Sequence, residues 1–282
     1  MSILKRLFDK TKRKEEGLEK HIDYIKTLKQ PTVHIQGIDN MTYSKIGGLP
    51  NLPDNLKWPT WKKKAQSFIC QIDLSEIPEN AQSLDLPKEG TFYFFNNQEQ
   101  ETWGFDPKDK GSWTVLFSPK SKNDISTSPM PDSLLKEFVF KEKYIQFSTI
   151  YTYPDWQDER INALELNDKQ FDEYEDLYQN VYNDEPAHQM LGTPSPIQGN
   201  DMDLECQLAS NGINCGDGNG YESKEAKKLS TGRNDWILLL QVDTDDDIDM
   251  MWGDSGMLYF WIRKQDIQLH DFTKCWMILQ CY

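Results

Sequence analysis

The chain has 282 residues and a formal net charge of −15, and 37% of its residues are hydrophobic. This length suffices for one large domain or two small ones, and the acidic surplus would repel the phosphate backbone, which excludes nucleic acid as a partner. No apolar run is long enough to span a bilayer and the basic start lacks the apolar core of a secretory signal, so we expect a cytoplasmic protein without a membrane partner.

Residues 1–30 are predicted to form an amphipathic helix with a basic face. They hold nine Lys/Arg against five Asp/Glu, Leu4, Leu7 and Phe8 lie on one side, and Pro31 marks the end. Such a helix can dock on its own domain, or it can lie on a membrane or on a partner. The narrow apolar stripe favours docking, with the charged face in solvent.

From residue 31 to about residue 151, short apolar runs alternate with Gly, Pro, Asn and Asp, which is typical of strands and turns. The strands of this region are predicted at 67–73, 90–96, 113–118, 137–141 and 145–151. Between residues 157 and 183, apolar residues recur at three- and four-residue steps on an acidic background. We expect a surface helix there whose buried face is formed by Phe171, Tyr174, Leu177, Tyr178 and Val181.

The C-terminal third predicts one short helix and three strands. The helix spans 201–210, with Asn200 or Asp201 as its N-cap and Gly212 beyond its end. After a Gly/Asn-rich turn, the strands follow at 236–243, 256–262 and 275–281. The unbroken apolar run WILLLQV indicates a strand that is covered on both faces and places this region near the centre of the fold, whereas the alternation in FICQIDL indicates one wetter face.

Sequence blocks of the first β region recur in the same order in the second, which indicates an internal repeat. FICQIDL matches LLLQVDT, EGTFYFF matches SGMLYFW, and WTVLF matches WMILQ. Neither copy could bury both faces of its few strands alone, so we expect the copies to share one core. The prediction is a single mainly β (α+β) domain over 31–282, in which repeat one (about 43–118) and repeat two (about 188–282) are joined by strands and an acidic helix at 137–183.

The run VDTDDDIDMMWGDSG is the densest group of candidate metal ligands. Asp243, Asp245, Asp247 and Asp254 fill oxygen-ligand places of an EF-hand loop, but Ile248 stands where that loop needs glycine and the last ligand is Asp in place of Glu. The run is therefore not an EF-hand. An irregular Ca²⁺ or Mg²⁺ site and a solvated acidic turn remain open, and the sequence favours the turn, so no cofactor is expected.

Two kinds of residue are candidates for a ligand-binding site. Trp252 and Asp254 flank a glycine, and Trp103 precedes one in a partial echo, TWGFDPKDKG. Such a group shapes either a pocket wall or, more commonly, a tight turn with a buried tryptophan. Gln71 and Gln241 are amides inside apolar runs, where a buried amide must find partners. They either line a cleft or meet across an axis that relates the two repeats.

Several of these motifs together resemble a known family. The combination of SKIGGLPNLPDNLKWP, FICQIDLSEIP, LPKEGTFYFF, WGFDP, HQMLGTPSPIQ and MMWGDSGMLYFWI is similar to the YwqG family of bacterial proteins, from about residue 30 to the end. The resemblance implies a β-rich fold of cytoplasmic bacterial proteins, with roll-like antiparallel sheets and peripheral helices. It brings no assigned activity and no catalytic residues, and the TDDDID run is richer in acid than the family pattern requires.

The sequence predicts a noncatalytic binding or protein-interaction module. It contains no GxSxG, HExxH, phosphate-binding glycine loop or Rossmann motif, and five cysteines without a CxxC pair are expected to be reduced thiols. Its aromatic residues and acidic surface favour a basic peptide or protein as the partner. The alternative is a metal-dependent hydrolase in which Asp243, Asp245, Asp247 and Asp254 hold an ion that activates water. The sequence does not indicate an oligomeric state.

Overall fold

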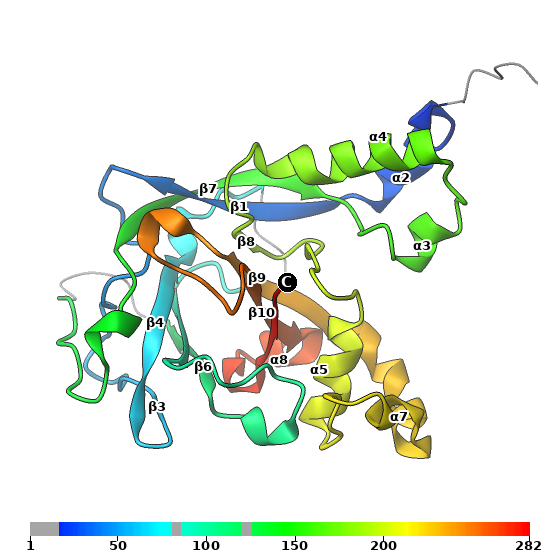
Figure 1. The fold of residues 1–282 in the computed structure, drawn as a ribbon. Coiled ribbons are helices and arrows are strands. Elements are labelled where there is room, and N and C mark those ends of the chain that lie inside the picture. The colour runs from blue at the N-terminus through cyan, green and yellow to red at the C-terminus, as the bar shows by residue number, and fades with distance from the viewer. Residues whose placement is uncertain (1–16, 81–85, 120–125) are drawn as a thin grey trace, which may run out of the picture.

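The computed structural model describes residues 17–80, 86–119 and 126–282. The strands within these ranges are β1 (Gln30–Ile38), β2 (Lys45–Ile46), β3 (Thr60–Trp61), β4 (Lys64–Asp73), β5 (Thr91–Asn97), β6 (Trp113–Ser118), β7 (Lys143–Thr152), β8 (Gln189–Met190), β9 (Trp236–Asp243), β10 (Met257–Arg263) and β11 (Trp276–Gln280). They form one antiparallel sheet that curls into a nearly closed roll (Figure 1).

Helices lie around this roll. The α-helices are α2 (Ile22–Leu28), α3 (Glu159–Asn162), α4 (Asp168–Gln179), α5 (Met202–Ser210), α6 (Asn219–Glu222), α7 (Lys224–Leu229) and α8 (Lys264–Gln268). The 3₁₀ helices are η1 (Leu18–Lys20), η2 (Leu74–Glu76), η3 (Pro107–Asp109), η4 (Lys136–Phe138), η5 (Asn180–Tyr182), η6 (Ser230–Asp235), η7 (Asp246–Ile248) and η8 (Phe272–Lys274). The predicted mainly β fold of roll-like antiparallel sheets with peripheral helices is confirmed.

β1 and β7 form the centre of the sheet, where they pair over nine positions. The short strand β8 pairs with β1, and the short strand β2 pairs with β7. Outward from this pair the order is β8-β9-β10-β11 on one side and β2-β4-β5-β6 on the other. We call β4-β5-β6 the first wing and β9-β10-β11 the second wing. The prediction that the second β region lies nearer the centre is wrong, because both wings flank the central pair in the same way.

Both wings contain the same irregularity. In the first wing, the register shifts between Phe68 and Cys70, so that Ile69 is an extra residue in β4 opposite β5. In the second wing, Leu239 is the extra residue in β9 opposite β10. Ile69 and Leu239 occupy the same place in the matched blocks FICQIDL and LLLQVDT. Shared bulges of this kind support the predicted duplication, which remains a prediction.

The two wings pack face to face through corresponding aromatic residues. The rings of Phe94 and Phe260 lie 5.2 Å apart, edge to face. Trp113 and Trp276 lie 4.9 Å apart, and the indole N–H of Trp113 donates to the carbonyl of Cys275 (3.0 Å). The main core therefore lies between the wings and contains residues of both.

Three sequence predictions about individual elements are wrong. The strand expected at 137–141 is η4 followed by a loop, which buries Phe140 without strand pairing. The single helix expected over 157–183 is interrupted, because Asn167 forms a capping box that starts α4 anew. The wetter face expected for β4 is buried, since a loop brings Leu52 and Trp58 onto it.

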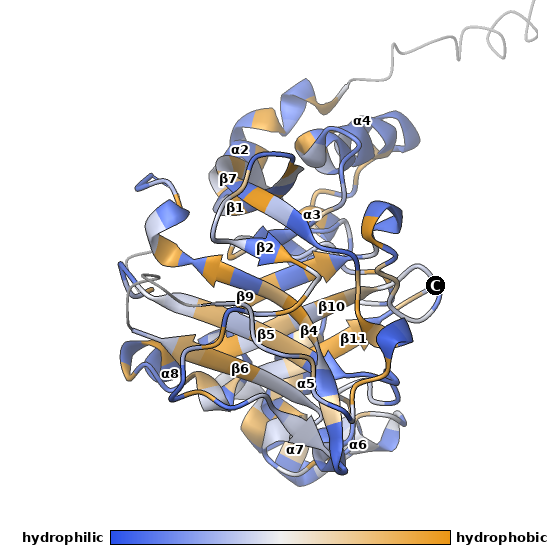
Figure 2. Ribbon diagram, turned by 90° about the vertical axis from the view of Figure 1, so that its left-hand side faces the viewer, coloured by the Kyte–Doolittle hydropathy of each residue, from blue (hydrophilic) through white to orange (hydrophobic). Residues whose placement is uncertain are grey.

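The helix expected at 201–210 is confirmed as α5, with Asp201 at its N-cap. Of the helix expected at 1–30, residues 1–16 lie outside the described residues, and η1 and α2 make up the rest. These two pack with α3 and α4 around a small separate cluster of Leu18, Ile25, Leu28, Ile161 and Tyr174. Figure 2 shows that α4 is largely hydrophilic, whereas many strands of the roll are hydrophobic.

Candidate functional site

Gln71 is buried in β4 and holds a loop of the first wing in place. Its side-chain oxygen accepts a hydrogen bond from the N–H of Asn51 (2.8 Å), and its NH₂ group donates to the carbonyl of Tyr43 (2.7 Å). The hydroxyl of Tyr93, which pairs with Gln71 across β4 and β5, donates to the carbonyl of Asn51 (2.9 Å). Both ends of the amide are thus used inside the protein.

Gln241 makes the corresponding contacts in the second wing. Its oxygen accepts from the N–H of Ser195 (2.8 Å), and its NH₂ group donates to the carbonyl of Ala187 (2.8 Å). Tyr259, its neighbour across β9 and β10, donates to the carbonyl of Ser195 (2.6 Å). Gln71 and Gln241 therefore bind the backbone of segments that precede their own wings in the chain, and both are buried away from any surface site.

The Asp-rich loop begins in a buried polar cluster around His188. Asp243 accepts from the N–H of Ala187 (2.9 Å), and its own N–H donates to Nδ1 of His188 (3.0 Å). Because Nδ1 accepts, the ring proton lies on Nε2, which is 3.6 Å from Oδ2 of Asp245. Burial raises the pKa of Asp243, whereas the neighbouring ring of His188 lowers the pKa of Asp245. These two carboxylates are bound within the fold.

The other two candidate aspartates of the loop, Asp247 and Asp254, make separate contacts. Asp247 pairs with Lys143 (2.9 Å), and the backbone carbonyl of Asp254 accepts from Tyr282 at an exposed turn. Within the described residues, no three His, Cys, Asp or Glu side chains form a group that could hold a metal ion. Asp243, Asp245, Asp247 and Asp254 are not brought together as a ligand set, so the predicted Ca²⁺ or Mg²⁺ site gains no support.

The two candidate tryptophans lie in different environments. Trp252 is buried against Phe140, with ring centroids 5.3 Å apart, and its indole N–H donates to the carbonyl of Asp243 (3.2 Å). This is the geometry of a core tryptophan beside a turn. Trp103 is 38% exposed on another loop, and its carbonyl accepts from Leu279 (3.0 Å). Neither residue lines the large cleft described next.

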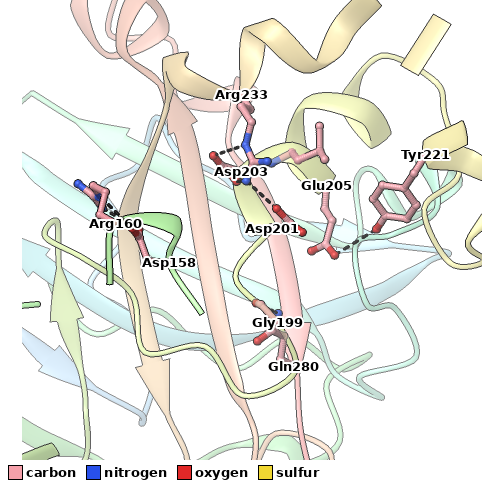
Figure 3. Close-up of polar contacts among 10 residues, drawn as sticks. Asp158, Arg160, Gly199, Asp201, Asp203, Glu205, Tyr221, Arg233 and Gln280 are labelled. Carbon is pink, nitrogen blue, oxygen red and sulfur yellow. Dashed lines mark hydrogen bonds and ion pairs between the residues drawn. The ribbon is translucent and has the colours of Figure 1, made fainter. Parts of the chain in front are cut away.

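A cleft of about 690 Å³ lies between α3, the start of α5, and η6. Figure 3 shows Asp158, Arg160, Asp201, Asp203 and Arg233 of this cleft. Strand β10 contributes to it through Trp261, and the full lining consists of Gln157, Asp158, Glu159, Arg160, Asn200, Asp201, Asp203, Arg233, Asn234 and Trp261. Four of these side chains are acidic and two are basic, so the cleft has a surplus of negative charge.

Each arginine of the cleft is held by aspartates. Asp158 caps α3 and binds Arg160 through two hydrogen bonds of 2.8 and 2.7 Å. Burial raises the pKa of Asp158, but the hydrogen bonds from Arg160 outweigh this effect and leave the pKa below its ordinary value. Across the cleft, Arg233 binds Asp203 at 2.9 and 2.6 Å and Asp201 at 2.8 Å. Both guanidinium groups are neutralised within the protein.

Two buried glutamines hold in position the segments that form the acidic wall of the cleft. Gln280 of β11 accepts from the N–H groups of Ile197 and Gln198 and donates to the carbonyl of Gly199 (3.0 Å), which fixes the loop before α5. Gln207 of α5 accepts from the indole of Trp236 (2.9 Å) and donates to a carbonyl just before η6. The start of α5 and η6 are thus anchored to strands of the second wing. An aspartate in the first turn of α5 is also favoured by the helix dipole.

Two groups at or near the cleft lack a partner. Trp261 is 7% exposed, and its indole N–H has no hydrogen-bond acceptor among the described residues. Glu205, one turn into α5, accepts from the hydroxyl of Tyr221 (3.2 Å) with one oxygen and leaves the other buried without a donor. Burial raises the pKa of Glu205 to about 7. An unpaired buried donor is costly, so Trp261 marks a place where a ligand oxygen would be favoured.

No pattern in the sequence predicted this cleft. Arg160 and Arg233 are 73 positions apart in the chain, and Arg233 lies in the segment STGRND, which contains no recognisable motif. The aspartates that bind Arg233 are 30 and 32 positions before it. The only local signal was the pair of acids at the start of the predicted helix 201–210, which capping explains equally well.

The curled antiparallel sheet with two matched wings and an acidic surface cleft defines a β-rich domain of roll type. The chain belongs to the family described as a domain of unknown function (DUF1963), whose model matches residues 44–281. A search of curated proteins finds no match to the chain. β1 precedes the matched region, although it is one of the two central strands. None of the helices in the described ranges has the length and apolar character needed to cross a lipid bilayer.

Proposed function

We propose that the protein is a noncatalytic binding module whose acidic cleft recognises a basic peptide or the basic segment of a protein. The surplus of carboxylates in the cleft carries this proposal, because both arginines are already neutralised by Asp158, Asp201 and Asp203. Glu159 is exposed and has no ion-pair partner among the described residues. A lysine or arginine of a ligand would pair with such a carboxylate.

The floor of the cleft adds a second element of recognition. A backbone carbonyl of a bound peptide would give the indole N–H of Trp261 the acceptor that it lacks. A cleft of about 690 Å³ has the volume for a few side chains. The alternative of a metal-dependent hydrolase has no comparable observation in its favour. The resemblance to the YwqG family and a bacterial, cytoplasmic setting remain predictions that are compatible with the family match.

The proposal is tested with a short fluorescein-labelled peptide of alternating lysine and alanine, whose binding to the full chain is followed by fluorescence anisotropy. We expect binding at low ionic strength that weakens as salt screens the charges. Glu159→Lys reverses a charge in the cleft and should weaken binding about fivefold or more.

Glu137→Lys is the matched control. Glu137 is also exposed and also lies in the first turn of a short helix, η4, outside the cleft. The substitution Glu137→Lys should leave the affinity for the labelled peptide nearly unchanged. Equal losses in both variants would mean that the peptide responds to total charge and not to the cleft, and an absence of binding at low salt would refute the proposal.

A further inference from the structure

The turn between β3 and β4 presents basic side chains on an acidic molecule. Trp61 of β3 pairs with Lys64 of β4, so Lys62 and Lys63 form a two-residue turn. Both turn lysines are exposed, and Lys63 has no ion-pair partner among the residues that the structure describes. Lys62 lies 3.8 Å from Glu101, and both of these side chains are more than half exposed. An exposed pair of this kind contributes little to stability, so Lys62 remains available to another carboxylate.

This turn contains lysine where its backbone favours other residues. The φ angles are +47° at Lys62 and +68° at Lys63. Positive φ at both positions is the mark of a type I′ turn, in which Asn-Gly is preferred and a long side chain is strained. Strain of this kind is found at functional sites. Lys64 pairs with Glu99, and the amine of Lys62 lies 3.8 Å from the centre of the Trp61 ring. The turn therefore presents two amines that are not needed to form it.

The acidic cleft has the complementary properties. Four of its side chains are acidic and two are basic, and Glu159 is exposed without an ion-pair partner among the described residues. Trp261, which lines the cleft, is 7% exposed, and its indole N–H has no acceptor in the described ranges. The carbonyls of Lys62 and Lys63 lie outside the strand pairing, so either can accept from this N–H. The strands of a hairpin are about 5 Å apart, so its tip is narrow enough for a cleft of about 690 Å³.

The turn and the cleft of one copy lie apart. In Figure 1 the turn between β3 and β4 is at the lower left of the roll, whereas α3 and α5, which border the cleft, are on the right. β4 is held in the sheet by β2 and β5, so the turn cannot swing across the molecule.

We infer that the β3–β4 turn of one copy binds in the acidic cleft of a second copy. The inference rests on the proposed function, since it names the basic segment that the cleft recognises. The amines of Lys62 and Lys63 pair with the surplus carboxylates of the cleft, Glu159 among them. Because the two contacting surfaces differ, the contact is heterologous, and further copies can be added head to tail.

This association is expected to be weak and sensitive to salt. A hairpin tip in a cleft buries much less than the roughly 1,600 Å² of a stable interface, and its attraction is mainly between charges. Sedimentation velocity of the full chain at rising concentration measures it. We expect a dissociation constant between about 0.1 and 1 mM at low salt, and monomers when salt screens the charges.

The test compares full-length variants that alter one of the two surfaces. The turn variant K62Q/K63Q should weaken self-association about tenfold, and the cleft variant E159K about fivefold or more. The matched control K88Q/K274Q removes the same charge from two exposed lysines outside the turn and the cleft, and it should associate like the unaltered chain. The turn variant keeps its cleft, so it should still bind the labelled lysine/alanine peptide, which also shows that it is folded.

Mixing the two variants gives the sharpest result. The turn variant supplies an intact cleft and the cleft variant E159K supplies an intact turn. An equimolar mixture should therefore associate about as tightly as the unaltered chain does, but it should stop at a dimer, because the remaining turn and the remaining cleft no longer attract each other.

The outcomes separate the inference from the proposed function. If the unaltered chain binds the labelled peptide but sediments as a monomer at every concentration, the inference is overturned while the proposed function stands. Self-association that the turn variant or E159K leaves unchanged, or a mixture that stays monomeric, places the contact elsewhere and also overturns the inference. If the chain neither binds the peptide nor self-associates at low salt, both proposals fail.

Discussion

The buried polar side chains of this protein fall into two groups: those whose polar atoms all have hydrogen-bond partners at both ends, and those that leave an atom without a partner. Gln71, Gln241 and Gln280 use both ends of their amides on backbone groups, and they are structural. Glu205 leaves one oxygen without a donor, which is why burial dominates its pKa. Unsatisfied groups are the ones that respond to pH or to a ligand.

Glu205 should make the stability of the protein depend on pH. Its pKa is raised to about 7 in the folded chain, above the value of about 4.5 for an exposed glutamate, so the folded state binds more protons between these values. The contribution of Glu205 to the free energy of unfolding is therefore fully present below about pH 4.5 and is lost as the pH rises through about 7. Glu205→Gln keeps the acceptor for Tyr221 and removes the charge, so above pH 7 it should stabilise the fold by about 2 kcal/mol.

Urea unfolding of the unaltered chain and of Glu205→Gln between pH 4.5 and 8 measures this difference. The gain from the substitution should grow with pH over the range and level off near pH 8. Glu225→Gln, on the exposed side of α7, is the control and should give a difference that does not change with pH. A constant difference for Glu205→Gln would show that its carboxylate ionises normally in the folded chain.

At the scale of elements, the sequence was informative where a strand is long and bounded by turns. β6 and β9 start and end at the predicted residues, since their apolar runs are flanked by Gly, Asp or Asn. β2 and β8 have two residues each and leave no periodic signal, although they join the wings to the centre. The cleft was invisible for another reason: its walls come from segments whose proximity depends on the completed roll.

The two wings should respond alike to the loss of their buried amides. Gln71→Met and Gln241→Met keep the side-chain volume but each removes one hydrogen bond to a backbone N–H and one to a backbone carbonyl. Each substitution should lower the free energy of unfolding by about 3 kcal/mol, measured by urea denaturation. Gln268→Met, on the exposed side of α8, should change it by less than about 0.5 kcal/mol. Unequal losses at the two positions would argue against equivalent roles in the wings.

At the scale of the whole molecule, the wings complete each other. Neither has a second layer of its own, because the aromatic faces that meet at Phe94 and Phe260 and at Trp113 and Trp276 come from different halves of the chain. The central strand β1 pairs with β7 of the first half and with β8 of the second. A shared core of this kind links the halves into one cooperative unit.

The chain should therefore unfold in a single transition, and its halves should not fold apart. Residues 1–155 contain the first wing with β1 and β7, and residues 156–282 contain the second wing with β8. Each fragment alone would expose the aromatic face that the other covers, so near-ultraviolet circular dichroism should show no fixed tryptophan environment until the two are mixed. For the intact chain, near- and far-ultraviolet signals should give the same urea midpoint. Two separate midpoints, or a fragment with native tryptophan signals by itself, would mean that each wing is an independent domain and that the shared core contributes little to stability.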